Sequence, residues 1–238
     1  MVDLETLSTR SNALILTIGA VPFNNTGDVS VGEELYFYQR VSLDSYQDCF
    51  SFHMDYKTLV WWMKQDKDPL NEAFLTEPRY SIHKVMANFR AWMEKICKLN
   101  NDNKINIWSH GKDFDVVVLE NAFRNCRVGC PWKYWDTRDT RTIYSLTGIN
   151  LSKFKMPEGF KAHNAIGDCL KQIAGLKKSF EILTNISSGG SEGSGISESN
   201  DKVGQRIEKE DNKEEQRIES DGNKEEQRIE NNEKDNTV

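Results

Sequence analysis

Hydrophobic residues in the first part of the chain fall into runs that predict strands. Ala13–Phe23 is apolar and bounded by turn residues, which is typical of a buried strand. Glu34–Val41 predicts a second strand. Lys104–Ser109, in which Ile105 and Ile107 alternate with polar residues, predicts a third. Together, these three runs predict a substantial part of a β-sheet.

Helical periodicity appears further along the chain. Ser81–Leu99 has apolar residues spaced three and four apart, which predicts an amphipathic helix with one buried face. A second helix is expected to begin near Asn164, a suitable N-cap, with Ile166, Leu170, Ile173 and Phe180 turned inward. Strands come first and helices interleave later, so the pattern predicts an α/β domain built around a mixed sheet.

The composition changes at Ser187, which sets the predicted domain organisation. Residues 1–186 are expected to fold, and residues 187–204 read as a Gly/Ser-rich linker. Residues 205–238 form an imperfect eleven-residue repeat with one isoleucine in each copy. No aromatic residue follows Phe180. Burial of so few apolar groups cannot offset the conformational entropy lost when the segment becomes ordered. The sequence therefore predicts an acidic, disordered tail.

The net charge of −6 comes from this tail, because residues 187–238 hold 8 basic and 15 acidic side chains. The body is close to neutral, which neither supports nor excludes nucleic-acid binding. Five cysteines without regular spacing argue against a zinc site and fit reduced thiols in a cytoplasmic protein, with a nuclear location as the alternative. No secretion signal or membrane-spanning run is expected.

Acidic residues near the start of the chain are the first candidates for chemistry. Asp3 and Glu5 are two apart, so on a strand their carboxylates point to the same face. Paired oxygen ligands of this kind suit Mg²⁺ or Mn²⁺. Only Met1 and Val2 precede Asp3, which predicts a very short first strand. On its own, the pair is more typical of an exposed acidic edge.

Two further acidic candidates follow the predicted strand Lys104–Ser109. Asp115 is expected near the start of a helix, at a strand-to-helix junction of the kind where α/β folds place ligands. Asp113 is the competing candidate, and a helix cap is the preferred interpretation of it.

Basic and histidine-containing patterns complete the set of candidates. Arg138 and Arg141 could bind phosphate through their guanidinium groups, or could be surface arginines at a capped helix start. His163 and Asp168 are five apart, which places them on different faces of a single helix. The spacing therefore predicts His163 on a mobile loop and Asp168 in the first turns of the helix that follows.

In combination, these patterns resemble the DEDDh 3′–5′ exonucleases, which have an RNase H-like, DnaQ-like fold. The resemblance covers about residues 1–183. The sequences Trp61-Trp62-x-x-Gln65, Phe114-Asp115 and Arg138-Asp139-x-Arg141-Thr142 are similar to the branch that contains phage exonuclease A and the mycobacterial exoribonucleases.

This resemblance implies two metal ions, Mg²⁺ or Mn²⁺, held by Asp3, Glu5, Asp115 and Asp168. It implies that His163 takes a proton from the attacking water, with nucleoside 5′-monophosphates released from the 3′ end. The expected partner is the 3′ end of single-stranded DNA or RNA.

Several expectations concern substrate contacts and alternatives. Trp61 and Trp62 are adjacent, so one is expected in the core while the other stacks on a base or is also structural. The candidate substrate-binding residues are Leu4, Thr6, Trp61, Trp62, Gln65, Arg138 and Arg141. The short first strand favours an alternative, a catalytically weak or inactive module that binds nucleic acid or protein. A homodimer stays open, and the sequence names no partner for the tail.

Overall fold

The computed structural model describes four stretches of the 238-residue chain: residues 1–29, 32–47, 51–99 and 105–188. Residues Met1–Ser187 form one compact unit. The predicted linker from residue 189 onward and the charged repeats lie outside the described residues.

The strands in this part of the chain are short. They are β1 (Val2–Thr6), β2 (Ile15–Ala20), β3 (Phe37–Val41), β4 (Arg79–Tyr80), β5 (Ile107–Ser109) and β6 (Thr137–Asp139). The α-helices are α1 (Tyr56–Met63), α2 (Lys67–Phe74), α3 (Ile82–Leu99), α4 (Asp115–Asn125), α5 (Thr140–Thr147) and α6 (Ala165–Ser188). Single turns of 3-10 helix occur at Glu33–Leu35, Leu43–Tyr46, Tyr134–Asp136 and Leu151–Lys153.

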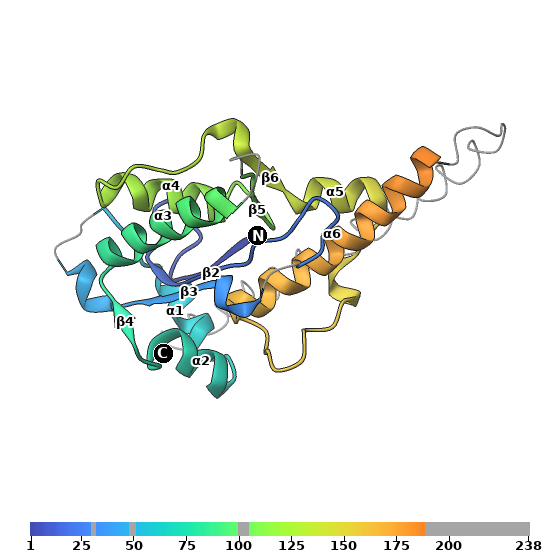
Figure 1. Cartoon of the computed structure of the whole chain (residues 1–238). Coiled ribbons are helices and arrows are strands. Elements are labelled where there is room, and N and C mark those ends of the chain that lie inside the picture. Colours follow the sequence, from blue (N-terminus) through green and yellow to red (C-terminus); the bar gives the residue numbers. More distant parts are fainter. Residues whose placement is uncertain (30–31, 48–50, 100–104, 189–238) are drawn as a thin grey trace, which may run out of the picture. The chain divides into compact units, whose positions relative to one another are not determined.

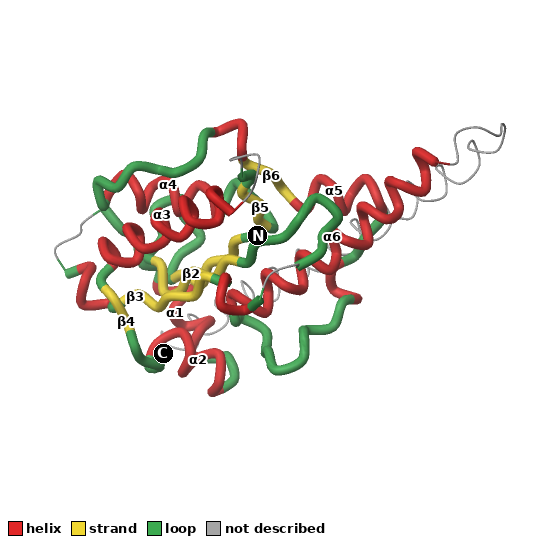
Figure 2. Tube along the Cα trace, in the orientation of Figure 1, coloured by secondary structure: helices red, strands yellow, loops and turns green. Residues whose placement is uncertain are grey.

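The sheet is mixed, as the sequence predicts. β1, β2 and β3 pair in antiparallel fashion, and β4 is parallel to β3. β5 and β6 form a parallel pair, and β5 lies next to β1 (Figure 2). The register places Asp3 opposite Gly19 and Glu5 opposite Thr17.

Helices cover both faces of this sheet (Figure 1). Val2 and Leu4 of β1 point into a hydrophobic core that includes residues of α3 and α4. Because side chains alternate along a strand, Asp3 and Glu5 point to the opposite face, where α6 packs. The alternation therefore separates the core from the acidic residues within one five-residue strand.

The predicted elements are confirmed with shorter bounds, apart from one segment. Glu34 and Leu35 belong to a 3-10 turn and not to the second predicted strand, which begins at Phe37. The reason lies in β2, which ends at Ala20 and is followed by Pro22, a residue without an N–H for a ladder. Without a partner strand, the Leu35 carbonyl instead accepts a hydrogen bond from Trp92 Nε1 at 2.8 Å.

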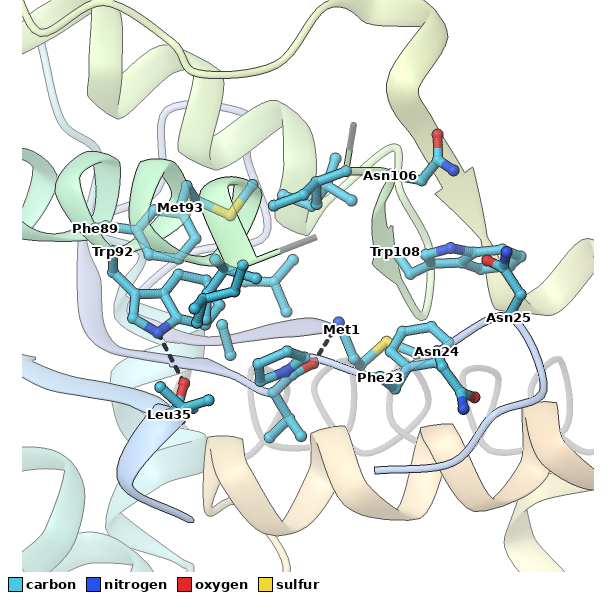
Figure 3. Close-up of a pocket in the computed structure, with 18 of the residues that line it drawn as sticks. Met1, Phe23, Asn24, Asn25, Leu35, Phe89, Trp92, Met93, Asn106 and Trp108 are labelled. Atoms are coloured by element: carbon cyan, nitrogen blue, oxygen red, sulfur yellow. Dashed lines mark hydrogen bonds between the residues drawn. The ribbon is translucent and has the colours of Figure 1, made fainter. Parts of the chain in front are cut away.

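A cavity of about 360 Å³ opens where β1 begins and β2 ends (Figure 3). Aliphatic and aromatic residues line it, with Phe23, Trp92 and Trp108 among them, and Asn106 stands at its edge. None of the site residues predicted from the sequence lines it. Within the described residues, no helix has the combination of length and apolar character needed to cross a membrane.

Gly19 sets how closely α6 approaches the sheet. A Cβ atom at this position would lie 2.6 Å from the backbone carbonyl carbon of Ala165 and 2.7 Å from its Cβ. Cβ atoms essentially never come so close to backbone, so only glycine leaves room for the first turn of α6. This contact brings the N-terminus of α6 onto the strand that is paired with β1.

We expect Gly19→Ala to lower the free energy of unfolding by about 1–3 kcal/mol, as overpacked cores commonly do. The obstacle is the backbone of Ala165, which cannot turn aside like a flexible side chain. Chemical denaturation of the two proteins measures the difference. Thr17→Val is the matched control on β2, because the buried Thr17 hydroxyl has no hydrogen-bond partner to lose. An unfolding free energy unchanged by Gly19→Ala would contradict the close contact.

Candidate active site

The acidic residues of β1 and α6 converge on one point. One carboxylate oxygen from each of Asp3, Glu5 and Asp168 lies within 4.8 Å of the other two. Asp168 is held in the first turn of α6, whose N-cap is Asn164 as predicted. The Asn164 side chain accepts hydrogen bonds from the backbone N–H groups of Ile166 and Gly167 at 3.2 and 3.1 Å.

Asp115 joins this group from the start of α4. It is only 5% exposed, and its carboxylate accepts hydrogen bonds from its own N–H and from the N–H of Leu4. Its negative charge acts on both Asp3 and Glu5. Asp113, by contrast, has a side chain that is 86% exposed and paired with Lys112 at 2.8 Å. The structure thus places Asp115 with the other carboxylates and leaves Asp113 at the surface.

The loop before Asp115 is held by a residue that was not among the candidate metal ligands. Asp139 ends β6, and its carboxylate accepts hydrogen bonds from the backbone N–H groups of Gly111 (3.2 Å), Lys112 (3.1 Å) and Arg141 (2.8 Å). The same carboxylate therefore caps α5 and fixes the loop that precedes Asp115. Gly111 has φ +99°, a left-handed conformation that favours glycine, and the Arg141 guanidinium packs against it.

Burial and mutual repulsion perturb all four carboxylates. Loss of solvation, and then the charges of the neighbouring acids, raise the pKa of Asp3 well above its usual value and that of Glu5 to about 8. Burial raises the pKa of Asp115 to about 7, although its backbone hydrogen bonds act in the opposite direction. Burial also raises the pKa of Asp168, against the influence of His163. Each shift favours the protonated acid unless a cation is supplied.

The protein supplies little positive charge of its own. Among the described residues, no Lys or Arg forms an ion pair with any of these four acids. Clustered, buried carboxylate oxygens without a cationic partner fit a hard divalent ion such as Mg²⁺ or Mn²⁺. The donor set thus meets the requirement for a divalent metal site.

His163 lies on the loop before α6, as its spacing from Asp168 predicts. Its φ of +64° is in the left-handed region, and its backbone N–H donates to Asp168 Oδ2 at 3.0 Å. The imidazole ring lies edge-on to two indoles, with centroid distances of 5.0 Å to Trp61 and 6.0 Å to Trp62. The imidazole is therefore held beside the acidic cluster by aromatic packing.

The two tryptophans have different environments. Trp62 is 1% exposed, and its Nε1 donates to the carbonyl of Thr6 at 2.9 Å. Its side chain thus supports β1 from within the core, and little of its surface is open to a ligand. Trp61 is 42% exposed and is the member of the pair that can meet a ligand.

Other candidate substrate contacts are also occupied within the protein. The Leu4 side chain is buried in the core, and the Thr6 hydroxyl donates to the Ser8 carbonyl at 2.8 Å. The Gln65 amide donates to the Trp61 carbonyl at 3.0 Å.

Of the two candidate arginines, Arg138 is committed to backbone carbonyls, those of Trp135 and Thr137, at 2.6 and 2.8 Å. Arg141 is exposed and close enough to lower the pKa of Asp115, so it is the arginine that faces the site.

Two features of the site were not predicted. Gln172 donates from Nε2 to Asp3 Oδ1 at 2.9 Å, and its position four residues after Asp168 on α6 is the one sequence signal that places it there. In addition, a hollow of about 410 Å³ lies beside His163, with Lys64 and Lys161 in its wall. Its wall also contains Asp66, so it carries charges of both signs.

The chain is similar to known exonucleases. The chain is 22% identical over 218 residues to an exodeoxyribonuclease of Enterobacteria phage T4, covering 81% of this chain and 93% of the phage protein. Its fold is similar to that of exonuclease I in a zinc-bound complex of the E. coli enzyme with single-stranded DNA. There the TM-score is 0.52 and the identity 13%, with 79% of this chain and 42% of that chain covered.

A product-bound structure of exonuclease I gives a similar result, with a TM-score of 0.50, 14% identity, and coverage of 77% and 45%. The chain thus spans less than half the length of the exonuclease I chains, and at these identities the likeness concerns the RNase H-like fold. The model of the Rv2179c-like 3′–5′ exoribonuclease domain matches residues 1–179. The chain therefore belongs to the Rv2179c-like 3′–5′ exoribonuclease family.

Proposed function

We propose that this 3′–5′ exonuclease removes nucleoside 5′-monophosphates from the 3′ ends of single-stranded nucleic acid. Asp3, Glu5, Asp115 and Asp168 would hold two divalent metal ions, and His163 would be the general base. The observation that supports this most directly is the cluster of carboxylates whose oxygens converge without a cationic partner. Such a cluster costs stability unless cations are bound, so its presence is best explained by metal-dependent chemistry.

Metal ions, when bound, would stabilise the charge on the attacking and leaving oxygens of an in-line phosphoryl displacement. The protein's own groups have separate tasks. The His163 imidazole accepts the proton of the attacking water. The contact of its ring with Trp61 holds the imidazole beside the carboxylates for this step.

Substrate binding would use the groups that remain accessible at the site. The exposed Trp61 offers a ring for stacking on a base, which is worth about 1–3 kcal/mol and tolerates any sequence. Arg141 lies near Asp115 and Lys64 borders the hollow beside His163, so both are available for phosphate oxygens. Lys161 borders the same hollow but is paired with Asp68 of α2.

The comparisons name different sugars, since the family model is an exoribonuclease and the phage relative an exodeoxyribonuclease. We therefore propose the single-stranded 3′ end as the substrate class. A direct test is digestion of matched DNA and RNA oligonucleotides, labelled at the 5′ end, with and without Mg²⁺ or Mn²⁺.

We expect a ladder of products shortened from the 3′ end, abolished by EDTA and restored by excess metal. Asp115→Asn should lose at least about 100-fold in single-turnover rate, because it weakens charge stabilisation worth several kcal/mol. Asp113→Asn is the matched control and should keep the wild-type rate, because its side chain is at the surface. Cleavage that persists in excess EDTA, or the reverse order of the two variants, would exclude the proposed site.

The raised pKa values predict how the metal-free protein responds to pH. Glu5 titrates near pH 8 and Asp115 near pH 7 in the folded protein, against about 4 in an unfolded chain. Between these limits the folded state binds more protons than the unfolded state, so stability falls as pH rises.

In EDTA, we therefore expect the melting temperature to fall between pH 5 and pH 8. The fall should be shallower in Glu5→Gln and in wild type with saturating Mn²⁺. A melting temperature that rises over this range in EDTA would mean that the carboxylates are not buried together.

His163 and Asp168 should differ in what their loss removes. A general base contributes about 10²–10⁴-fold, so His163→Ala should lose turnover by about that factor and keep its affinity for Mn²⁺. Asp168→Ala should lose both turnover and Mn²⁺ binding. The measurements are single-turnover rates from pH 5 to pH 9 and Mn²⁺ titration calorimetry. An unchanged rate and pH profile in His163→Ala would assign this histidine a structural role.

A further inference from the structure

Gln172 makes the side-chain contact that reaches into the acidic cluster from α6. It is four residues after Asp168, so the two side chains share one face of the helix. Gln172 is 5% exposed, and its Nε2 donates to Asp3 Oδ1 at 2.9 Å across 169 residues of sequence. One helix therefore supplies both a carboxylate of the cluster and a donor to another carboxylate of the same cluster.

Asp3 is the carboxylate that most needs such a donor. It lies among Glu5, Asp115 and Asp168, and each of these charges opposes its own. A carboxylate in that position tends to rotate away from its neighbours or to take up a proton. The amide of Gln172 holds one of its oxygens from the side of α6, which leaves the other oxygen free to face the cluster.

The main chain of Gln172 is itself fixed by α5. The Tyr144 hydroxyl donates to the Gln172 carbonyl at 2.5 Å, and the Thr140 hydroxyl hydrogen-bonds to Tyr144. Thr140 in turn lies 2.8 Å from Nδ1 of His110. Tyr144 reaches α6 because Gly175 leaves space, since a Cβ there would lie 2.7 Å from the tyrosine hydroxyl. A continuous path of hydrogen bonds thus runs from the end of β5 to Asp3.

The choice of glutamine at this position costs stability. Its Oε1 is buried and has no hydrogen-bond partner, and an unsatisfied buried acceptor is destabilising. An apolar side chain of the same length would fill the space without that cost. A lysine would bring a cation into the cluster in competition with metal ions, and a glutamate would add another negative charge. A neutral donor is the side chain that orients Asp3 without either effect.

We propose that Gln172 is a positioning residue, which holds the Asp3 carboxylate in the orientation required for a metal ligand, and that Tyr144 keeps Gln172 in place. This inference rests on the proposed function of the acidic cluster. Groups that hydrogen-bond to metal ligands commonly contribute about 10–100-fold to metal affinity or activity.

The test compares Mn²⁺ binding to the full-length protein by titration calorimetry. Gln172→Met keeps the length of the side chain and removes the donor, and Gln172→Glu replaces the donor by an acceptor. We expect both variants to bind Mn²⁺ about 10–100-fold more weakly than wild type. In Gln172→Met, the metal concentration required for half-maximal cleavage should rise, and the rate at saturating Mn²⁺ should recover.

Ser179→Ala is the matched control. Ser179 is a buried polar residue on the same helix, it donates to the Gly175 carbonyl at 3.0 Å, and it has no contact with the acidic cluster. The Ser179→Ala protein should keep the wild-type affinity for Mn²⁺. In EDTA, Gln172→Met should melt no lower than Ser179→Ala, because it removes an unsatisfied buried acceptor.

Tyr144→Phe tests the second half of the proposal. It should weaken Mn²⁺ binding less than Gln172→Met does, and the double variant should be no weaker than Gln172→Met alone, because both changes act through one contact. Additive losses of Mn²⁺ affinity in the double variant would mean that Tyr144 acts independently of Gln172. That result would overturn the proposed role of Tyr144.

The outcomes distinguish this inference from the proposed function. Wild-type affinity for Mn²⁺ in a folded Gln172→Met protein would overturn the positioning role. If that variant fails to fold, Gln172→Glu and Tyr144→Phe give the same comparison. If wild type binds Mn²⁺ but cleaves no oligonucleotide, the nuclease proposal is rejected. The Mn²⁺ affinities of the variants then still decide whether Gln172 positions Asp3. Wild type that binds no Mn²⁺ would overturn both.

Discussion

Mutual repulsion among four buried carboxylates is the constraint on which the rest of this structure depends. Isolated acidic residues of this kind would move apart into water, and each of the four has a raised pKa in the fold. They stay together because they come from three separate elements, β1, α4 and α6, each fixed by contacts elsewhere. The free energy of the hydrophobic cores therefore offsets the cost of assembling the site.

Each of these elements is fixed by a different kind of contact. β1 is held by its pairing with β2 and by the Trp62 indole, which donates to the Thr6 carbonyl. α6 is placed by the absence of a side chain at Gly19. The start of α4 is held through the Asp139 carboxylate, which binds the loop in front of it. Since β1 is paired along its whole length, Asp3 is anchored in the sheet although the strand is short.

The sequence predicts those parts of the site that follow from local periodicity. Alternation along a strand places Asp3 and Glu5 on one face, and a five-residue offset places His163 on a loop before Asp168. Contacts between distant segments leave no such signal, because they depend on which rotamer meets which backbone group. This is why Gln172 was missed, and why adjacency alone could not tell Trp61 from Trp62.

The backbone of His163 has a consequence for relatives of this protein. A left-handed conformation is easiest for glycine and uncommon for other residues, among which asparagine, aspartate and histidine adopt it most often. Glycine is therefore the substitution that this loop accepts most easily. A relative with glycine here and all four carboxylates intact would keep the acidic cluster and lack the imidazole that we propose as the general base. Nuclease activity in such a relative would show whether the chemistry needs this loop residue.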